Sequence, residues 1–218
     1  MGRRTAVLIS GSGSNLQALL DATAAPGASA EIVLVVSNRA EAFGLQRARR
    51  AGVPALVVPH RDFPDRPSFD AALDAALREA GVELVCLAGF MRLLTGPFVE
   101  AWRDRMLNIH PSLLPSFRGA DAHVQALAAG VRITGCTVHL VRPEMDTGPI
   151  LLQGLVPVLP GDTVETLSRR TLEVEHVCYP RALDLVASGR VSVEAGRARI
   201  AGIEPGRLLV RHPMLGAG

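Results

Sequence analysis

The sequence predicts an α/β protein with a single doubly wound, mostly parallel sheet and helices on both faces. Short, almost continuously apolar runs at residues 5–10 and 84–88 are typical of strands that are buried on both sides. Segments with helical spacing, such as residues 41–51, alternate with these runs, as they do in parallel sheets. Hydrophobic residues make up 48% of the 218, and the mean hydropathy is +0.26, so the chain can bury a sizeable core.

The remaining elements follow the same alternation. A Gly/Ser loop after the first strand opens into a helix that includes Leu16, Leu19 and Leu20. Asp162, with Glu165 three residues later, resembles a capping box at the start of a long helix. Further strands are expected at residues 32–36, 55–58, 106–110, 134–141 and 150–156, and further helices at 69–80 and 124–129. We expect one domain over residues 1–190, and a peripheral tail over 191–218 that begins as a small hairpin and is not a separate domain.

Composition excludes several classes of function. The net charge of +2 offers no electrostatic footprint for nucleic acid or a membrane surface. No apolar run approaches the roughly 18 residues of a transmembrane helix, and the run at residues 6–9 is too short for a signal peptide. The cysteines Cys86, Cys136 and Cys178 lack CxxC spacing, so we expect reduced, buried thiols in a cytoplasmic protein.

Asn108 and His110 are the strongest candidates for chemistry. Their two-residue spacing in a strand places both side chains on the same face. Pro111 and Pro115 end the strand directly after His110, because each removes a backbone donor. An amide can stabilise an oxyanion, and an imidazole can move a proton near neutral pH. The alternative is a strand end whose polar side chains only satisfy a turn.

The loop at residues 11–15 predicts an anion site. Glycines allow a close backbone approach, and the free N–H groups of the following helix can donate to a phosphate. Dinucleotide binding is disfavoured, because Leu16 replaces the third glycine and the second strand ends in Ser37, Asn38 and Arg39 without an acidic residue. A phosphate monoester fits better, and an ordinary glycine-rich turn remains the alternative.

Three further loops are expected at the same edge of the sheet. Residues 89–94 form an apolar loop with one charge, which suits a flat aromatic ligand or a buried turn. Residues 116–123 are polar and form a candidate lid. Asp146 either occupies a surface turn or hydrogen-bonds to one nitrogen of His110 and fixes its tautomer.

The sequence blocks resemble a known family when they are taken in order. The matching blocks are GSGSNLQ, SNRAEAFGLQRARRAG, AGFMRLL, LNIHPSLLPSFRGADAHVQAL, GCTVHLV, MDTGPILLQ and VEHVCYP. Together they resemble phosphoribosylglycinamide formyltransferase over roughly residues 5–190. The resemblance implies a Rossmann-like formyltransferase fold and formyl transfer from the co-substrate 10-formyltetrahydrofolate to the amine of glycinamide ribonucleotide, in purine biosynthesis and without a metal.

The resemblance also implies a role for individual residues. Asn108, His110 and Asp146 would be catalytic. The ribonucleotide would bind to Gly13, Ser14, Asn15, Leu16, Gln17 and Glu175. The folate would bind to Arg66, Met91, Arg92, Leu93, Leu94, Asn108, Arg142, Pro143, Glu144, Met145 and Asp146.

Two other functions stay open. One is hydrolysis of 10-formyltetrahydrofolate, and the other is a non-catalytic nucleotide-binding module. The presence of Asn108, His110 and Asp146 together disfavours the module, because binding alone needs no proton relay. We expect small-molecule substrates, no nucleic-acid or membrane partner, and a monomer or a homodimer.

Overall fold

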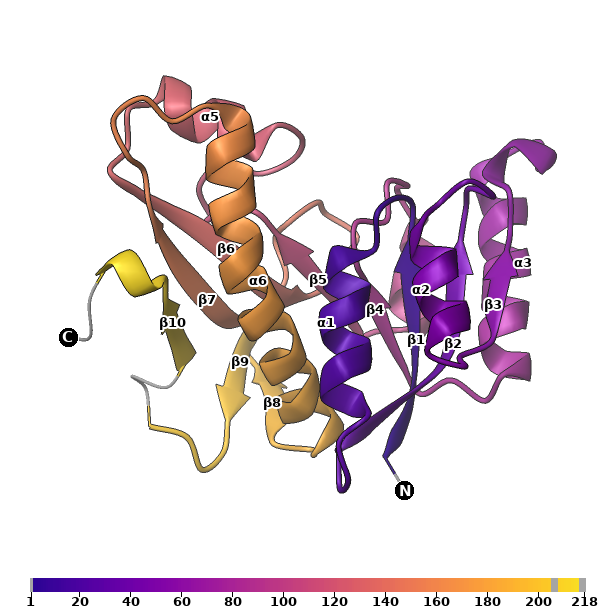
Figure 1. Ribbon diagram of the computed structural model, residues 1–218. Coiled ribbons are helices and arrows are strands. Elements are labelled where there is room, and N and C mark those ends of the chain that lie inside the picture. Colours follow the sequence, from indigo (N-terminus) through magenta and orange to yellow (C-terminus); the bar gives the residue numbers. More distant parts are fainter. Residues whose placement is uncertain (1, 205–207, 216–218) are drawn as a thin grey trace.

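A computed structural model describes residues 2–204 and 208–215 of the chain, and its centre is an eight-stranded sheet (Figure 1). The strand order is β10-β7-β6-β5-β4-β1-β2-β3. The bounds are β1 (Arg3–Ile9), β2 (Ala30–Ser37), β3 (Ala55–Val57), β4 (Leu84–Leu87), β5 (Met106–His110), β6 (Ile133–Leu140), β7 (Ile150–Pro157) and β10 (Leu209–Arg211). Among the described strands of this sheet, only β6 runs antiparallel to its neighbours, so the prediction of a mostly parallel sheet is confirmed.

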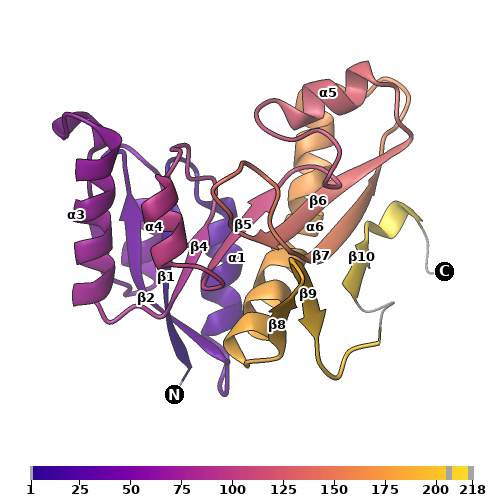
Figure 2. The same cartoon turned by 180° about the vertical axis from the view of Figure 1, so that it is seen from behind.

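Helices cover both faces of the sheet. They are α1 (Ser14–Thr23), α2 (Gly44–Arg50), α3 (Arg66–Glu79), α4 (Gly96–Ala101), α5 (Ala122–Ala128) and α6 (Val164–Ala187), with 3-10 turns η1 (His60–Asp62) and η3 (Pro213–Leu215). Leu16 of α1, Leu45 of α2 and Val174 of α6 belong to one apolar cluster. Phe69 and Trp102 belong to a second cluster on the opposite face, where α3 and α4 lie (Figure 2). This two-faced core is the doubly wound arrangement that the sequence predicted.

The C-terminal tail contributes two features. The predicted hairpin is present as β8 (Val191–Glu194) paired with β9 (Arg197–Ile200). The sequence did not anticipate β10, which adds a parallel strand beside β7. His212, directly after β10, contacts Glu173 of α6 through a 3.0 Å bond between Nε2 and Oε2. The tail therefore joins the main sheet, while the boundary at residue 190 stays a prediction.

The cap of α6 differs from the prediction by one residue. Thr163, not Asp162, is the N-cap: its hydroxyl accepts from the Thr166 N–H at 3.2 Å, and Thr166 Oγ1 accepts from the Thr163 N–H at 2.9 Å. Asp162 instead forms an ion pair with Arg170, with contacts of 2.7 and 2.8 Å. The expected capping box from Asp162 to Glu165 is wrong, because the threonine pair has the required spacing one position later.

The three cysteines are free and buried, as predicted. Burial raises the pKa of the Cys86 thiol to about 12, which keeps this thiol protonated at neutral pH. None of the helices within residues 2–204 and 208–215 combines the length and the apolar character needed to cross a membrane.

Candidate functional site

Two cavities lie at the edge of the sheet where the parallel strands β1, β2, β4 and β5 end. The larger has a volume of about 610 Å³ and the smaller about 400 Å³. In open α/β sheets this carboxyl edge is where ligands bind. The two cavities share five lining residues, Gly89, Met91, Ile109, Pro111 and His123, so they meet beside the end of β5.

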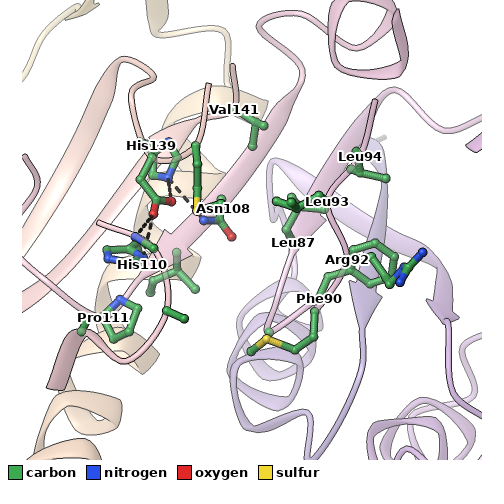
Figure 3. A pocket seen from close by; sticks show the side chains of 18 of the residues that line it. Leu87, Phe90, Arg92, Leu93, Leu94, Asn108, His110, Pro111, His139 and Val141 are labelled. Carbon is green, nitrogen blue, oxygen red and sulfur yellow. Dashed lines mark hydrogen bonds and ion pairs between the residues drawn. The ribbon is translucent and has the colours of Figure 1, made fainter. Parts of the chain in front are cut away.

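β5 presents Asn108 and His110 to the larger cavity, as the sequence predicted (Figure 3). The intervening Ile109 and the preceding Leu107 are buried in the core cluster. The strand ends at His110, where Pro111 removes the next backbone donor. The His110 side chain is only 7% exposed, so its ring nitrogens depend on protein partners.

His110 lies beside Asp146, which confirms that the loop between β6 and β7 reaches β5. Nδ1 of His110 is 3.4 Å from Oδ2 of Asp146 (dashed in Figure 3). Nε2 lies 2.8 Å from the carbonyl oxygen of Phe117. Because a carbonyl only accepts, Nε2 carries a hydrogen and donates it. The ring is therefore oriented from both sides, by a carboxylate and by the segment at residues 116–123.

Asp146 is held in an unusual backbone conformation. Its φ is 55°, and Phe117 across the site also has a φ of 55°. The Asp146 Oδ2 accepts a 2.8 Å bond from the backbone N–H of Gly119. Gly148 allows the chain to pass β6 closely, since a Cβ there would lie 1.6 Å from the Leu140 carbonyl oxygen. Positive φ angles at non-glycine residues often occur at functional sites, where surrounding contacts hold the strained backbone in place.

His139 is a site residue that we did not predict. It pairs directly with Asn108 across β5 and β6, at a β-bulge in β6. Its Nδ1 donates to the Leu140 carbonyl at 3.0 Å, and burial lowers the pKa of His139, which favours the neutral ring. Nε2 then accepts from Nδ2 of Asn108 at 3.3 Å and fixes the orientation of the amide. The alternation of residues 134–141, which places Thr137 and His139 on one strand face, was the available signal.

The smaller cavity is built around the loop before α1. Gly13 has a φ of 70°, and a Cβ there would lie 2.7 Å from the Gly44 Cα, so only glycine fits between α1 and α2. Asn15 donates from Nδ2 to Oε2 of Glu175 at 2.6 Å, which brings together two residues that are 160 positions apart. Burial raises the pKa of Glu175. Oδ1 of Asn15 is buried without a partner among the described residues.

The predicted binding residues divide between cavity walls and other positions. Those that line the larger cavity, besides Asn108 and Asp146, are Met91, Arg92, Leu93, Leu94, Arg142, Pro143 and Met145. Gly13, Ser14, Asn15 and Glu175 line the smaller one. Leu16 lies in the core, and Gln17 bonds to Asp21 and Arg47. Leu16, Gln17, Arg66 and Glu144 are not among the lining residues of either cavity. The described residues contain no group of three or more His, Cys, Asp or Glu able to hold a metal ion.

The two cavities meet beside the end of β5 and form one candidate site at the carboxyl edge of the sheet. The chain belongs to the formyl transferase family, whose model matches residues 3–183. It is 41% identical to the phosphoribosylglycinamide formyltransferase of Escherichia coli (strain K12), over 90% of this chain and 92% of that protein.

Two other comparisons agree with this family. A trifunctional purine biosynthetic protein adenosine-3 from Gallus gallus is 59% identical over 89% of this chain, which spans 19% of that protein's length. The solved structure of glycinamide ribonucleotide transformylase 1 from Symbiobacterium toebii is 54% identical and matches with a TM-score of 0.89, covering 91% of this chain and 94% of that one.

Proposed function

We propose that this formyltransferase moves a formyl group from 10-formyltetrahydrofolate to the amine of N1-(5-phospho-D-ribosyl)glycinamide in purine biosynthesis. The observation that carries the proposal is the meeting of a largely apolar cavity and a second cavity, lined by the glycine-rich loop, beside the end of β5. A transfer between two bound molecules needs two sites that share one reaction point.

The smaller cavity suits the ribonucleotide. The N–H groups at the start of α1, and the close approach that Gly13 allows, favour a phosphate. Glu175 lies at the far side of the same loop, bonded to Asn15, where a carboxylate can accept from the hydroxyls of a ribose. Ser14 adds a hydroxyl donor at the first position of α1. We therefore assign these residues to the ribonucleotide and keep Leu16 as a contributor of its backbone N–H. We keep Gln17 as a support of the loop through Arg47, because its own N–H already donates to the Gly13 carbonyl at 3.0 Å.

The larger cavity suits the pterin of a folate. Its walls include Phe90, Leu94, Val141 and Met145, with Arg92 and Arg142 among them (Figure 3 labels all but Met145 and Arg142). A flat aromatic ring gains from apolar walls, whereas its polar edge needs a few donors and acceptors. Arg66 at the start of α3 and Glu144 lie outside the lining residues, and we retain them as contacts to more distant parts of the co-substrate.

Transfer requires stabilisation of an oxyanion and protonation of a leaving nitrogen. When the amine attacks the formyl carbon, the Asn108 amide can donate to the developing oxyanion, because His139 fixes its orientation. His110 can accept the proton that the attacking amine loses and can supply a proton to the leaving folate nitrogen. Asp146 balances positive charge on the ring. The buried position of both side chains strengthens these interactions. No covalent enzyme intermediate is required.

The proposal also covers the cellular location, the oligomeric state and the binding partners of the enzyme. We assign it to the cytoplasm, as a monomer or a homodimer that uses no metal and binds neither nucleic acid nor a membrane. The low net charge of +2 supports the absence of a nucleic-acid partner.

A folate deformylation assay tests the function against its two alternatives. The protein is mixed with 10-formyltetrahydrofolate, with and without the ribonucleotide amine, and loss of the formyl group is followed. We expect deformylation only when the amine is present, with formylated ribonucleotide as the product. Deformylation without the amine identifies a hydrolase, and no reaction in either mixture identifies a binding module.

A further inference from the structure

We propose that Arg39 is the side chain that neutralises the phosphate of the ribonucleotide substrate and so sets the specificity for a phosphorylated acceptor. This inference rests on the proposed function and adds a binding residue to it. Arg39 follows β2 and lines the smaller cavity together with the loop at residues 10–15. The sequence had drawn attention to Arg39 only because it stands where a dinucleotide-binding protein carries an acidic residue.

The sheet places Arg39 beside the loop at residues 10–15. β1 and β2 are parallel neighbours, and Ile9 pairs with Ser37 at their carboxyl ends. The loop that begins at Ser10 and the loop that carries Arg39 therefore leave the sheet side by side. In dinucleotide-binding α/β proteins, an arginine in this region accommodates the 2′-phosphate of a ribose, so the position is compatible with a phosphate-binding cation. The same physical position serves here for a phosphate monoester.

The other ionisable residues that line the smaller cavity provide no permanent positive charge for a phosphate. The ionisable lining residues of this cavity are Arg39, His123 and Glu175. Burial lowers the pKa of His123, which favours its neutral form, and the Glu175 carboxyl group is neutral or negative, so neither is a source of permanent positive charge. Leu172 and Ser168 of α6 occupy the wall near Glu175 and are uncharged. Among the described lining residues, Arg39 is therefore the permanent cation that can balance the anion.

The backbone of Arg39 is fixed while its guanidinium is free. Its N–H donates to Ser37 Oγ at 3.1 Å, and its carbonyl accepts from the same hydroxyl at 2.7 Å. The neighbouring Asn38 is buried and accepts at 2.6 Å from Ser10 Oγ, which ties the two loops together. Across the described part of the chain, these bonds of Arg39 use its backbone, and its exposed side chain has no hydrogen bond or ion pair. A fixed backbone and a guanidinium without protein partners suit bidentate binding of a phosphate.

Arg47 provides the contrast that makes this assignment specific. It is also near the phosphate loop, but its Nε donates to the Ser12 carbonyl at 2.9 Å and one amino group donates to Gln17 Oε1 at 3.2 Å. Its guanidinium carbon also lies 5.1 Å above the ring of Phe43. Arg47 thus supports the loop from outside the cavity, whereas Arg39 is available to the ligand.

The test compares Arg39→Gln, Arg39→Lys and Arg50→Gln with the unmodified full chain. Arg50 is an exposed arginine of α2 that lines neither cavity, so it is a matched loss of charge. Each protein is assayed with the ribonucleotide and with the same riboside without its phosphate. We expect Arg39→Gln to raise KM for the ribonucleotide by about 10–100-fold, the range of a charge-assisted hydrogen bond, with little change in kcat or in KM for the folate. Arg39→Lys should recover part of this loss, and Arg50→Gln should show none.

The riboside separates a phosphate contact from a general disturbance. With the riboside, Arg39→Gln and the unmodified protein should perform equally, because the contact that Arg39 makes is already absent. An unchanged KM for the ribonucleotide, or an equal loss with both acceptors, overturns the role of Arg39. Failure of the proposed function is distinguishable, because the unmodified protein would then transfer no formyl group to the ribonucleotide. A thermal melt of each variant shows whether a loss of folding contributes.

Discussion

The two cavities at the ligand edge are constructed in different ways. In the larger one, the proposed chemistry depends on side chains: Asn108, His110, His139 and Asp146 are oriented by one another and by carbonyl groups. In the smaller one, the main contribution is backbone, from the helix start at Ser14 and the left-handed Gly13. Side-chain contacts, including the proposed contact of Arg39, can be changed without moving the chain, whereas the backbone part of the smaller cavity can be changed only through its geometry. The comparison predicts different responses to mutation at the two ends of the reaction.

The largest effect is expected where two side chains act as one unit. Asp146→Asn keeps the shape of the carboxylate but loses its charge toward His110, and His110→Ala removes the ring. Each should lower turnover by roughly 10²–10⁴, with the KM for the folate changed much less. The double mutant should cost little more than either single change, because residues that act as a unit are non-additive. Steady-state kinetics of the three variants measures this coupling.

Multiplied losses in the double mutant would show that His110 and Asp146 contribute independently. The 3.4 Å contact between Nδ1 and Oδ2 would then be structural only. Circular dichroism and a thermal melt of each variant provide the folding control, because Asp146 also holds Gly119.

A smaller effect is expected at Asn108. Asn108→Ala should lower turnover by about 10²–10³, the usual loss for one donor to an oxyanion. His139→Ala removes the acceptor that orients this amide, together with a 3.8 Å contact between Nε2 and Oδ1 of Asp146. We expect a loss of roughly tenfold, which corresponds to one neutral hydrogen bond. In the Asn108→Ala background, His139→Ala should have almost no further effect on kcat. If His139→Ala reduces kcat as much in that background, His139 contributes by a route other than Asn108.

The backbone site should respond in binding instead of turnover. Gly13→Val places a branched side chain at a φ of 70°, against a backbone atom of Gly44. We expect ribonucleotide affinity to fall at least about tenfold while the folate still binds, since the anion loop is displaced and the larger cavity is not. Calorimetry with each ligand makes the comparison. Equal weakening of both ligands would indicate a folding defect and would remove the distinction between the cavities.

Strand and helix patterns predicted the parallel sheet because each buried strand leaves a continuous apolar run. They also located Asn108 and His110, since two prolines mark the strand end. The sequence did not reveal β10 (Leu209–Arg211), whose three residues have no pattern long enough to recognise. The cap of α6 was misplaced because Asp162 and Thr163 are both good capping residues. The bonds between Thr163 and Thr166, and the pairing of Asp162 with Arg170, distinguish them in the structure.

The candidate site shows the same limit at a longer range. The position of Asp146 near His110 was a hypothesis, because nothing local fixes a contact across 36 positions (146 − 110). His139 has the alternation of an ordinary strand, and its role depends on the cross-strand pair with Asn108. Glu175 was assigned to the ribonucleotide by the resemblance alone, and its burial against Asn15 depends on the packing of α6 against α1. In each case the missing information is the packing of distant segments.

The smallest effect is expected at an ion pair outside both cavity linings, and it tests whether stability and the two sites are separable. The side chains of Asp162 and Arg170 are 4% and 12% exposed, and Asp162 also accepts from the Leu159 N–H at 2.7 Å. Hydrogen bonds from Arg170, first of all, hold the pKa of Asp162 well below its usual range. A depressed folded-state pKa stabilises the protein above the unfolded value, near 3.9, and this contribution is lost as the pH falls. Asp162→Asn should therefore lower the free energy of unfolding by about 1–3 kcal/mol at pH 7, with both KM values unchanged.

Urea titrations from pH 7 to 3 measure the difference in free energy of unfolding between the two proteins. This difference should narrow below about pH 4, because Asp162 begins to protonate in the unfolded chain. Glu100→Gln is the matched control, because its pair with Arg103 is exposed and should contribute much less. A difference that stays constant over the whole pH range would mean that the charge of Asp162 is not what stabilises the start of α6.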